Sequence, residues 1–327
     1  MAALRGVNLG GWLVLEKWIT PSIFAQTDAT NEYQLSQHAA GRKKIAHHHK
    51  TFITEADFEW LAQNGIELIR IPFGHWVFGD TRPYVGAIDH LDWAVAMAKK
   101  YKIQVLLDMH AAVGAQNQAD HSGSGRPHAA EAWLRNRTQQ RETIAVIEKV
   151  VTRYHHESHI WGIQLLNEPG FDRLGFRLIR FYRAAYRAVQ RVARPGTRVV
   201  FSDAYAPWLL TGALWSRANY PVVMDSHFYY CFGPLKTAPF AVQKRRIETA
   251  RRMIHVLNWF QPVMIGEWSA SLDISVDKAT RAEFIWLQLQ SQQHAVATCY
   301  WNYKTEQDSW WSYRYVVQEK LLPSPAD

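Results

Sequence analysis

The stretch ELIRIPFGHW at residues 67–76 is followed by IDHLDWAVAMAKK at residues 88–100 and by IQVLLDMH at residues 103–110. The first and third segments are largely apolar runs, which is typical of strands that are buried on both faces of a parallel sheet. The middle segment repeats its apolar residues at helical spacing. Strand, helix and strand in this order predict one βαβ unit.

The same alternation continues on both sides of this unit. Helical spacing recurs at residues 55–63, 141–155, 176–192, 242–257 and 280–294. The strand-like segments are residues 4–9, 67–73, 103–110, 160–167, 198–203, 222–228, 262–268 and 296–301. Eight such units without a glycine-rich phosphate loop after the first strand favour a closed barrel over a dinucleotide-binding sheet. We therefore predict an α/β fold, a single (β/α)8 TIM barrel domain over residues 1–327.

Two connections are predicted to be long and irregular. They cover residues 16–51, after the first strand, and residues 111–137, after the third. The second contains GAQNQADHSGSG, a composition that disfavours a helix. Because barrel enzymes build their sites from loops at the C-terminal strand ends, both loops are expected to border the active site.

Composition excludes several classes of protein. Of the 327 residues, 48% are hydrophobic and 20% are charged, which excludes a disordered, collagen-like or coiled-coil chain. No apolar run approaches the ~20 residues of a membrane-spanning helix. The net charge of +8 is spread along the chain without a nucleic-acid motif. We expect neither a nucleic acid nor a membrane as partner, and we expect a monomer.

The cysteines and the start of the chain bear on location and metals. Two cysteines, Cys231 and Cys299, cannot form a disulfide framework. The beginning of the chain shows no basic region followed by an apolar run, as a signal peptide would. A cytoplasmic protein, or the trimmed form of an exported one, is therefore expected. The triplet at residues 47–49 has no acidic or cysteine ligand at suitable spacing, so we predict no metal site.

Tryptophan is unusually frequent, with fifteen residues in the chain. Some of these side chains can be absorbed by a core, but each carries an N–H that prefers a hydrogen-bond partner. The count alone has two explanations. The tryptophans can form aromatic platforms for a hydroxylated ligand such as a sugar, or they can simply pack in the core.

Polar side chains gather at the C-terminal ends of the predicted strands. A buried strand end has no structural need for them, because an unpaired buried polar group costs about 1–3 kcal/mol. Their convergence on one barrel mouth therefore predicts an active site there. The residues are Asn8, Arg70, Asp108, His110, Asn167, Glu168, Asp203, His227, Tyr229, Glu267 and Trp301.

Two carboxylates stand out in this set. Glu168 and Glu267 follow the fourth and seventh strands, in the apolar contexts LLNEPG and MIGEWS. Glycoside hydrolysis needs two such groups, one to protonate the leaving oxygen and one to attack the anomeric carbon. Arg70 beside Glu267 is expected to keep that carboxylate ionised. Partial burial near a second negative charge is expected to raise the pKa of Glu168.

Seven motifs together resemble glycoside hydrolase family 5 of clan A, in the branch of exo-β-1,3-glucanases and their bacterial relatives. They occur in family order and span about residues 4 to 317. The motifs are RGVNLGGWLVLEKWITPSIF (5–24), IRIPFGHW (69–76), LLDMHAAVGAQNQADHSG (106–123), LLNEP (165–169), DSHFY (225–229), IGEWS (265–269) and YWNYKTE (300–306).

The resemblance implies roles for the residues at the matching positions. Glu168 would be the acid/base and Glu267 the nucleophile of a retaining mechanism. Asn167 would bind the 2-hydroxyl of the sugar. Arg70 and Tyr229 would position and ionise Glu267. The resemblance implies no cofactor.

It also implies how the sugar is held at the cleavage point. His110 and His227 would bind the sugar and tune the acid/base. Trp301 would form the floor on which the sugar stacks. Glu16 and Asn117 match positions that bind the terminal glucose in the exo-acting branch.

The sequence departs from this branch in the loop after the third strand and in the eighth-strand motif. That loop reads HAAVGAQNQ (110–118), where the branch usually has a Gly after the His and a Pro-Gly pair. Gln118 replaces an aromatic residue after the Asn of the third motif, so we expect a weaker aromatic clamp for the leaving sugar. Asn302 stands where Thr is common. The chain is also shorter than the fungal exo-enzymes, so the pocket that enforces exo cleavage is expected to be less closed.

The expected function is a retaining β-glycosidase that acts on a β-glucan, most readily a β-1,3-linked one. A β-1,4- or β-1,6-glucanase and a β-glucosidase of small glucosides or glucolipids stay open as alternatives. So does a catalytically silent carbohydrate-binding protein on the same fold.

Overall fold

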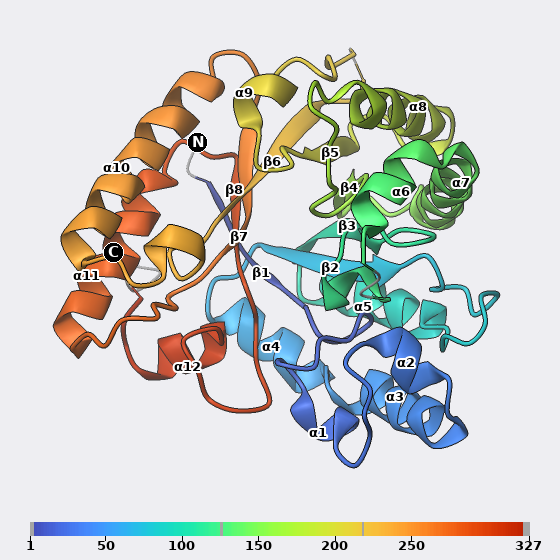
Figure 1. Cartoon of the computed structure of the whole chain (residues 1–327), viewed down its shortest axis with the longest axis horizontal. Helices are drawn as coiled ribbons and strands as arrows, with labels where there is room; N and C mark the ends of the chain where they lie inside the picture. The colour runs from blue at the N-terminus through green and yellow to red at the C-terminus, as the bar shows by residue number, and fades with distance from the viewer. Residues whose placement is uncertain (1–2, 125–126, 218, 323–327) are drawn as a thin grey trace.

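Eight parallel strands form one closed barrel in sequence order, in a computed structural model that describes residues 3–124, 127–217 and 219–322 (Figure 1). The ring closes where β1 pairs with β8, with Leu4 opposite Ala297 and Val7 opposite Tyr300. The predicted (β/α)8 barrel is thereby confirmed. The strands are β1 (Leu4–Asn8), β2 (Leu68–Gly74), β3 (Gln104–Ala111), β4 (Ile160–Gln164), β5 (Arg198–Ser202), β6 (Val222–Phe228), β7 (Val263–Trp268) and β8 (Ala297–Tyr300).

The helices lie around the barrel in Figure 1. Three of them have the predicted bounds: α4 (Glu55–Gln63), α5 (Ile88–Lys100) and α8 (Phe176–Val192). The other long helices that cover the strands are α7 (Arg137–Tyr154), α10 (Phe240–Leu257) and α11 (Lys278–Ser291). Between β5 and β6 the described residues form one helical turn, α9 (Pro207–Leu210), and α12 (Tyr313–Gln318) follows β8.

α7 begins four residues before its predicted start. The side chain of Asn136 accepts hydrogen bonds from the backbone N–H groups of Thr138 and Gln139 at 3.1 Å each. This N-cap satisfies donors that the first turn leaves free, so the helix extends beyond its apolar stripe.

The two long connections are more regular than predicted. The first contains α1 (Pro21–Phe24), α2 (Glu32–Ser36) and the 13-residue α3 (Ala39–Thr51), and the second contains η1 (Asp120–Ser122) and α6 (Ala129–Arg135). A further single turn, η2 (Gly233–Leu235), follows β6. α3 escaped prediction because it buries only a glycine, one isoleucine and two histidines, which make no apolar stripe.

The inside of the barrel has two layers. Alternate residues of a strand share a face, so Leu68 and Arg70 both point inward, and Val223 and Asp225 do the same. The N-terminal layer is apolar and contains Leu68, Leu106, Trp161, Val200, Val223, Met264, Ala297 and Cys299. The layer above it is polar and equally buried, with Asn8, Arg70, Asp108, Gln164 and Asp225. The barrel therefore carries its charged groups toward the C-terminal ends of the strands.

Both cysteines are free and buried, in agreement with the absence of a disulfide framework. Among the residues that the structure describes, no helix combines the length and the apolar character needed to cross a membrane.

Candidate active site

Arg70 is the centre of the polar layer. Its side chain is fully buried, and all five of its N–H donors are used. Nε donates to Gln164, and the two terminal nitrogens donate to four more groups at 2.8–3.0 Å, which are Asn8, Glu267, Asn167 and Asp108. Such a planar fork fixes the direction of every group it touches. Arg70 thus links β1, β2, β3, β4, β7 and the segment after β4.

Glu267 lies near the end of β7 and receives two hydrogen bonds. Arg70 donates to Oε1 at 3.0 Å, and the Tyr229 hydroxyl donates to Oε2 at 2.8 Å. These contacts hold the carboxylate at the base of the pocket, and both partners were predicted.

Glu168 follows β4 and approaches Glu267 from the opposite side of the mouth. Its Oε1 lies 2.6 Å from His227 Nδ1 and accepts a short hydrogen bond from the Tyr205 hydroxyl. One oxygen of Glu168 and one of Glu267 lie within 4.8 Å of each other and of a His227 ring nitrogen. The backbone of Glu168 has a φ of 38°, in the left-handed region that residues with a side chain rarely adopt. This turn directs the carboxyl group into the mouth.

His227 joins the two carboxyl groups. Its Nδ1 lies 2.6 Å from Glu168 and 3.4 Å from Glu267, and its Nε2 lies 3.1 Å from Asp225. Burial lowers the pKa of His227, but the charges of Glu267 and Asp225 outweigh burial and raise the pKa well above its usual value. The imidazolium form is therefore favoured between the carboxylates.

The pKa order of the two glutamates is the reverse of the expected one. Burial raises the pKa of Glu168, but the hydrogen bond and charge of His227 outweigh burial, so the pKa lies below its usual value. Burial raises the pKa of Glu267 more than the charges of His227 and Arg70 lower it. The expectation for the two pKa values weighed Arg70 and mutual repulsion, and the resemblance gave His227 a tuning role without a direction, whereas His227 contacts Glu168 most closely. Of the three groups, His227 is the one whose charged form its neighbours favour most directly, and it lies at hydrogen-bond distance from Glu168.

Trp301, the predicted floor for the sugar, packs against His110, and Asn167 lies next to His110. The rings of His110 and Trp301 are parallel, with centroids 5.5 Å apart and an interplanar angle of 5°. A Cβ on Gly10 would lie 2.8 Å from the Trp301 ring, so the close approach of the β1 backbone requires glycine there. Trp301 is only 3% exposed, yet it lines the pocket. The amide of Asn167 lies 3.4 Å from His110 Nε2.

Asn302, the departure from the usual Thr, holds the loop after β1. Its Oδ1 accepts from Gly10 N, and its Nδ2 donates to Gly10 O, both at 2.8 Å. A threonine hydroxyl cannot span both backbone groups, so the amide fixes Gly10 against the β8 loop.

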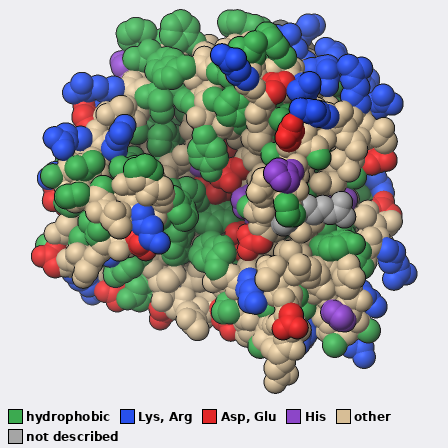
Figure 2. Space-filling model, in the orientation of Figure 1, with side chains coloured by type: hydrophobic (Ala, Val, Ile, Leu, Met, Phe, Trp, Pro, Cys, Tyr) green, Lys and Arg blue, Asp and Glu red, His purple; other side chains and the backbone are tan. Residues whose placement is uncertain are grey.

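The carboxyl pair lies in a pocket of about 520 Å³ at this mouth. On the face in Figure 2, acidic side chains lie near the centre and hydrophobic ones surround much of them. The residues that line the pocket are Glu16, Trp18, Ala119, Asp120, His121, Glu168, Tyr205, Tyr229, Phe232, Glu267, Trp301 and Trp311. Trp18, Tyr229 and Phe232 all contact the ring of Trp311, with centroids 5.2–5.9 Å apart.

The structure places Glu16 in the pocket wall but not Asn117. Asn117 donates to the backbone oxygen of Glu168 at 2.9 Å and accepts from Ala119 N at 3.0 Å. Its amide therefore supports the loop, while Asp120 and His121 line the pocket in its place. Burial and then the charge of Asp120 raise the pKa of Glu16 well above its usual value.

Sequence reasoning missed Asp120, His121, Trp18, Tyr205, Phe232 and Trp311. Asp120 and His121 lie inside the quoted GAQNQADHSGSG string, whose polar residues were visible, but no periodicity indicated which of them point into the pocket. The four aromatic residues lie outside the helices and strands, where periodicity gives no information about the direction of a side chain.

Two clusters among the described residues have donor atoms close enough to hold a cation. One is Glu168, His227 and Glu267, and the other is Glu16, Asp120 and His121. In the first, His227 Nδ1 lies 2.6 Å from Glu168 Oε1, so these two donor atoms are already paired by a hydrogen bond. The histidine triplet at residues 47–49 belongs to neither cluster and lies on α3.

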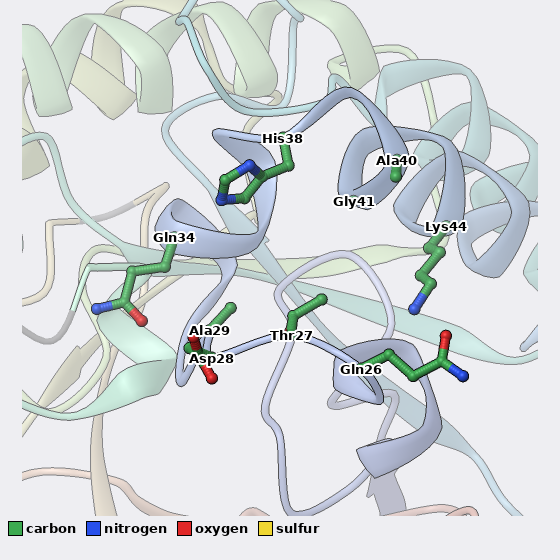
Figure 3. A pocket seen from close by; sticks show the side chains of 9 residues that line it. All are labelled: Gln26, Thr27, Asp28, Ala29, Gln34, His38, Ala40, Gly41 and Lys44. Carbon is green, nitrogen blue, oxygen red and sulfur yellow. The ribbon is translucent and has the colours of Figure 1, made fainter.

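A second, larger hollow of about 730 Å³ lies beside α2 and α3 (Figure 3). It has one acidic residue among the described residues that line it, Asp28, so it cannot supply a carboxyl pair. The lining residues are Gln26, Thr27, Asp28, Ala29, Gln34, His38, Ala40, Gly41 and Lys44. Among the described residues, the carboxyl pair of Glu168 and Glu267 thus lies at the barrel mouth and not in this hollow.

A barrel with two closely spaced carboxyl groups in an aromatic-lined mouth defines the class of glycoside hydrolases. The family model described as Cellulase (glycosyl hydrolase family 5) matches residues 25–307. The chain therefore belongs to glycoside hydrolase family 5, as the sequence motifs predicted.

Several known proteins are similar to the chain. A probable glucan 1,3-beta-glucosidase A of Aspergillus niger is 31% identical and matches 99% of this chain and 88% of its own length. A glucan 1,3-beta-glucosidase of Kluyveromyces lactis is 29% identical over 98% of this chain and 89% of its own length. The rutinosidase structure from Aspergillus niger superposes with a TM-score of 0.85 over 98% of both chains at 22% identity, which is a likeness of fold.

Proposed function

We propose that the protein is a retaining β-glucan hydrolase that prefers β-1,3 linkages and releases glucose from chain ends. The observation that carries the mechanism is the placement of one oxygen of Glu168 and one of Glu267 within 4.8 Å of each other. Retaining glycosidases have carboxyl groups about 5–5.5 Å apart, whereas inverting ones need about 6.5–9.5 Å to admit a water.

In this proposal Glu267 is the nucleophile. Arg70 and Tyr229 each donate to one of its oxygens, so both are held while one attacks the anomeric carbon. The first step forms a bond from a Glu267 oxygen to that carbon and breaks the bond to the leaving oxygen. The second step hydrolyses this glycosyl–enzyme bond with water.

Glu168 is the proposed acid/base. The leaving oxygen needs a proton in the first step, and the attacking water loses one in the second. The raised pKa of His227 favours a protonated ring 2.6 Å from Glu168. In this proposal that proton moves to the carboxylate when a sugar covers Glu267 and weakens its attraction for the imidazolium. Tyr205 fixes the same oxygen of Glu168.

The choice of substrate is supported by the relatives at 29–31% identity, which are named for glucan 1,3-beta-glucosidase activity. Glu16 and Asp120 line the same pocket as the carboxyl pair and offer acceptors for the hydroxyls of a terminal sugar. Trp301 supplies an apolar ring face at the cleavage point.

A product profile tests the proposal. Laminarin, pustulan, carboxymethylcellulose and aryl β-glucosides are incubated with the protein, and the products are separated and their anomeric form is followed by NMR. We expect laminarin to be cleaved fastest, with glucose released first as the β-anomer. Oligosaccharides as first products contradict exo action, the α-anomer contradicts retention, and sugar binding without any turnover indicates a silent binding protein.

A further inference from the structure

The connection between β5 and β6 covers its side of the barrel without a full helix. Residues 203–221 form one helical turn, α9, among those that the structure describes. Leu210 and Leu214 of this connection are buried in the core. Trp208 and Trp215 of the same connection are 60% and 69% exposed. The protein therefore presents large apolar side chains to solvent on this side.

Two neighbouring segments extend the apolar surface. A Cβ on Gly175 would lie 3.6 Å from Leu209, so the start of α8 lies beside α9. On the other side, Gln261 accepts from the N–H of Gly212 and donates to the backbone oxygen of Leu214. We call the combined surface the apolar flank. Its large exposed side chains are Leu174, Phe176, Trp208, Trp215, Trp259 and Phe260.

The charge contributed by these segments has one sign. Residues 173–202 contain eight arginines and neither Asp nor Glu, and residues 204–224 and 249–266 also lack both acids. In Figure 2 hydrophobic side chains gather along the upper edge of the molecule, in the region of α9, and Lys and Arg side chains gather beside them in the region of α8. An apolar surface with a positive border is typical of an interaction site.

Three of the arginines border the flank directly. Arg180, Arg183 and Arg187 are spaced by three and four residues, so they share one face of α8, which begins with Phe176. Arg183 Nε donates to Ala213 O at 3.2 Å, which places this face against the connection between β5 and β6. The ion pairs of α8 among the described residues are made by other arginines, so the guanidinium groups of Arg180 and Arg187 have no carboxylate partner there.

The charge decides between the occupants that an apolar surface could have. A second copy bound across a twofold axis would bring the arginine faces of two α8 helices together, which like-charge repulsion disfavours. A bilayer of anionic lipids is complementary to both features of the flank. Trp and Phe favour the boundary between head groups and acyl chains, and arginine binds phosphate groups by paired hydrogen bonds. Leu174 suits acyl chains as well, whereas it offers no ring for a nucleic-acid base.

We propose that the apolar flank binds the surface of an anionic membrane. The aromatic side chains enter the boundary of the bilayer, and the arginines of α8 bind the lipid phosphates. The expectation of no membrane partner considered a spanning helix, which a protein that lies on a bilayer does not need. Because Tyr205 lines the catalytic pocket two residues before α9 begins, the bound protein holds its barrel mouth beside the membrane.

Vesicle binding tests the proposal and requires no substrate, so its result is independent of the proposed hydrolase function. The protein is sedimented with vesicles of phosphatidylcholine alone and with vesicles of phosphatidylcholine and phosphatidylglycerol, at low and at high salt. At low salt we expect partition onto the anionic vesicles to exceed partition onto the neutral ones about tenfold. The excess should shrink at high salt, because salt screens the attraction.

Reversal of charge tests the arginines. Arg180→Glu combined with Arg187→Glu should lower partition onto the anionic vesicles by more than about tenfold, since each arginine near the surface contributes about fivefold. The matched control is Lys43→Glu combined with Lys50→Glu, which makes the same change in net charge at the same spacing on α3. Figure 1 shows α3 on the opposite edge of the molecule from α9, so this control should retain most of the binding.

Removal of an aromatic side chain tests the apolar part. Trp259→Ser should weaken partition onto both kinds of vesicle about fivefold. Trp286→Ser removes a similarly exposed tryptophan from α11, outside the flank, and should leave partition unchanged. The substituted residues are all exposed, so the variants should fold.

Several results would overturn the inference. They are absence of binding to the anionic vesicles at low salt, equal binding to anionic and neutral vesicles, and a loss in either control as large as in its partner variant. A dimer in light scattering that Trp259→Ser dissociates, without vesicle binding, would assign the flank to a second copy instead.

Discussion

The two layers inside the barrel are built from the same strands and differ in almost every physical property. On β2, Leu68 belongs to the apolar layer and Arg70, two residues later, is the centre of the polar one. On β6, Val223 and Asp225 stand in the same relation. Two residues along a strand therefore separate an apolar side chain that fills the barrel from a polar side chain that holds the reacting carboxylates.

The difference between the two layers shows how one strand can contribute both to stability and to the chemistry of the site. The apolar layer gains stability from burial without direction. The polar layer is equally buried but must satisfy each group by a specific partner, as the five bonds of Arg70 do. Substitutions in the two layers should therefore separate cleanly into losses of stability and losses of turnover.

The largest effect is expected for Glu267→Ala in the polar layer. Without the nucleophile, kcat should fall on the order of 10⁴-fold or more, while Tm stays close to that of the parent. Added azide or formate should restore part of the turnover by attacking from the vacated side. Retention of even a tenth of the parent kcat without added anion would exclude Glu267 as the nucleophile.

Glu168→Ala should produce a loss that depends on the leaving group. Glucan and alkyl glucosides need a proton in the first step and should lose about 10²–10⁴-fold in kcat/KM, whereas activated aryl glucosides should lose far less. Steady-state kinetics on a series of glucosides of graded leaving-group acidity measures this. A uniform loss across the series would contradict the acid/base role.

Met264→Ala, three residues before Glu267 on β7, tests the apolar layer. The cavity should cost about 2–5 kcal/mol in the free energy of unfolding. Denaturant unfolding measures this loss, and kcat of the folded variant at low temperature should stay within a few-fold of the parent. A variant of unchanged stability and lost activity would show that the layers are not separable.

The smallest expected effect lies outside the barrel, on α3. Burial lowers the pKa of His49 to about 3 and that of His48 to about 4. Unfolded histidines take up protons below about pH 6.5 while these two stay neutral in the folded protein, so the free energy of unfolding falls as pH drops from 6.5 toward 3. His49→Leu should remove about 1 kcal/mol of this loss at pH 5.5 relative to pH 7.5.

The control for this measurement is His47→Leu, because His47 lies on the same helix and is exposed. Its unfolding curves at the two pH values should differ as much as those of the parent. If both variants respond alike, burial of His49 is not the cause of the acid sensitivity.

Much of the fold was predictable because strand periodicity and apolar runs are local properties. The same locality located Glu168, Glu267 and Arg70, since each lies in or directly after a strand with apolar neighbours: Arg70 within β2, Glu267 near the end of β7 and Glu168 after β4. The resemblance implied that His227 tunes the acid/base, but the direction of its effect was not predicted, and it reverses the expected pKa order of the two glutamates. That reversal depends on a distance of 2.6 Å between residues 59 positions apart, which no local pattern encodes.

The loop residues that line the pocket could not be predicted from the sequence for a related reason. Asp120 and His121 line the pocket because Asn117 turns the chain between the backbone of Glu168 and that of Ala119. The sequence shows which polar groups these side chains carry. Their direction depends on a hydrogen bond from Asn117 to the backbone after β4, which is far away in the sequence.

The left-handed backbone of Glu168 has a consequence for the history of the chain. A side chain at a φ of 38° costs on the order of 1–3 kcal/mol, which glycine would avoid. Selection for folding alone would therefore favour glycine at this position, while selection for turnover keeps glutamate. A lineage that ceased to need the reaction should lose this residue early and become more stable as it does so.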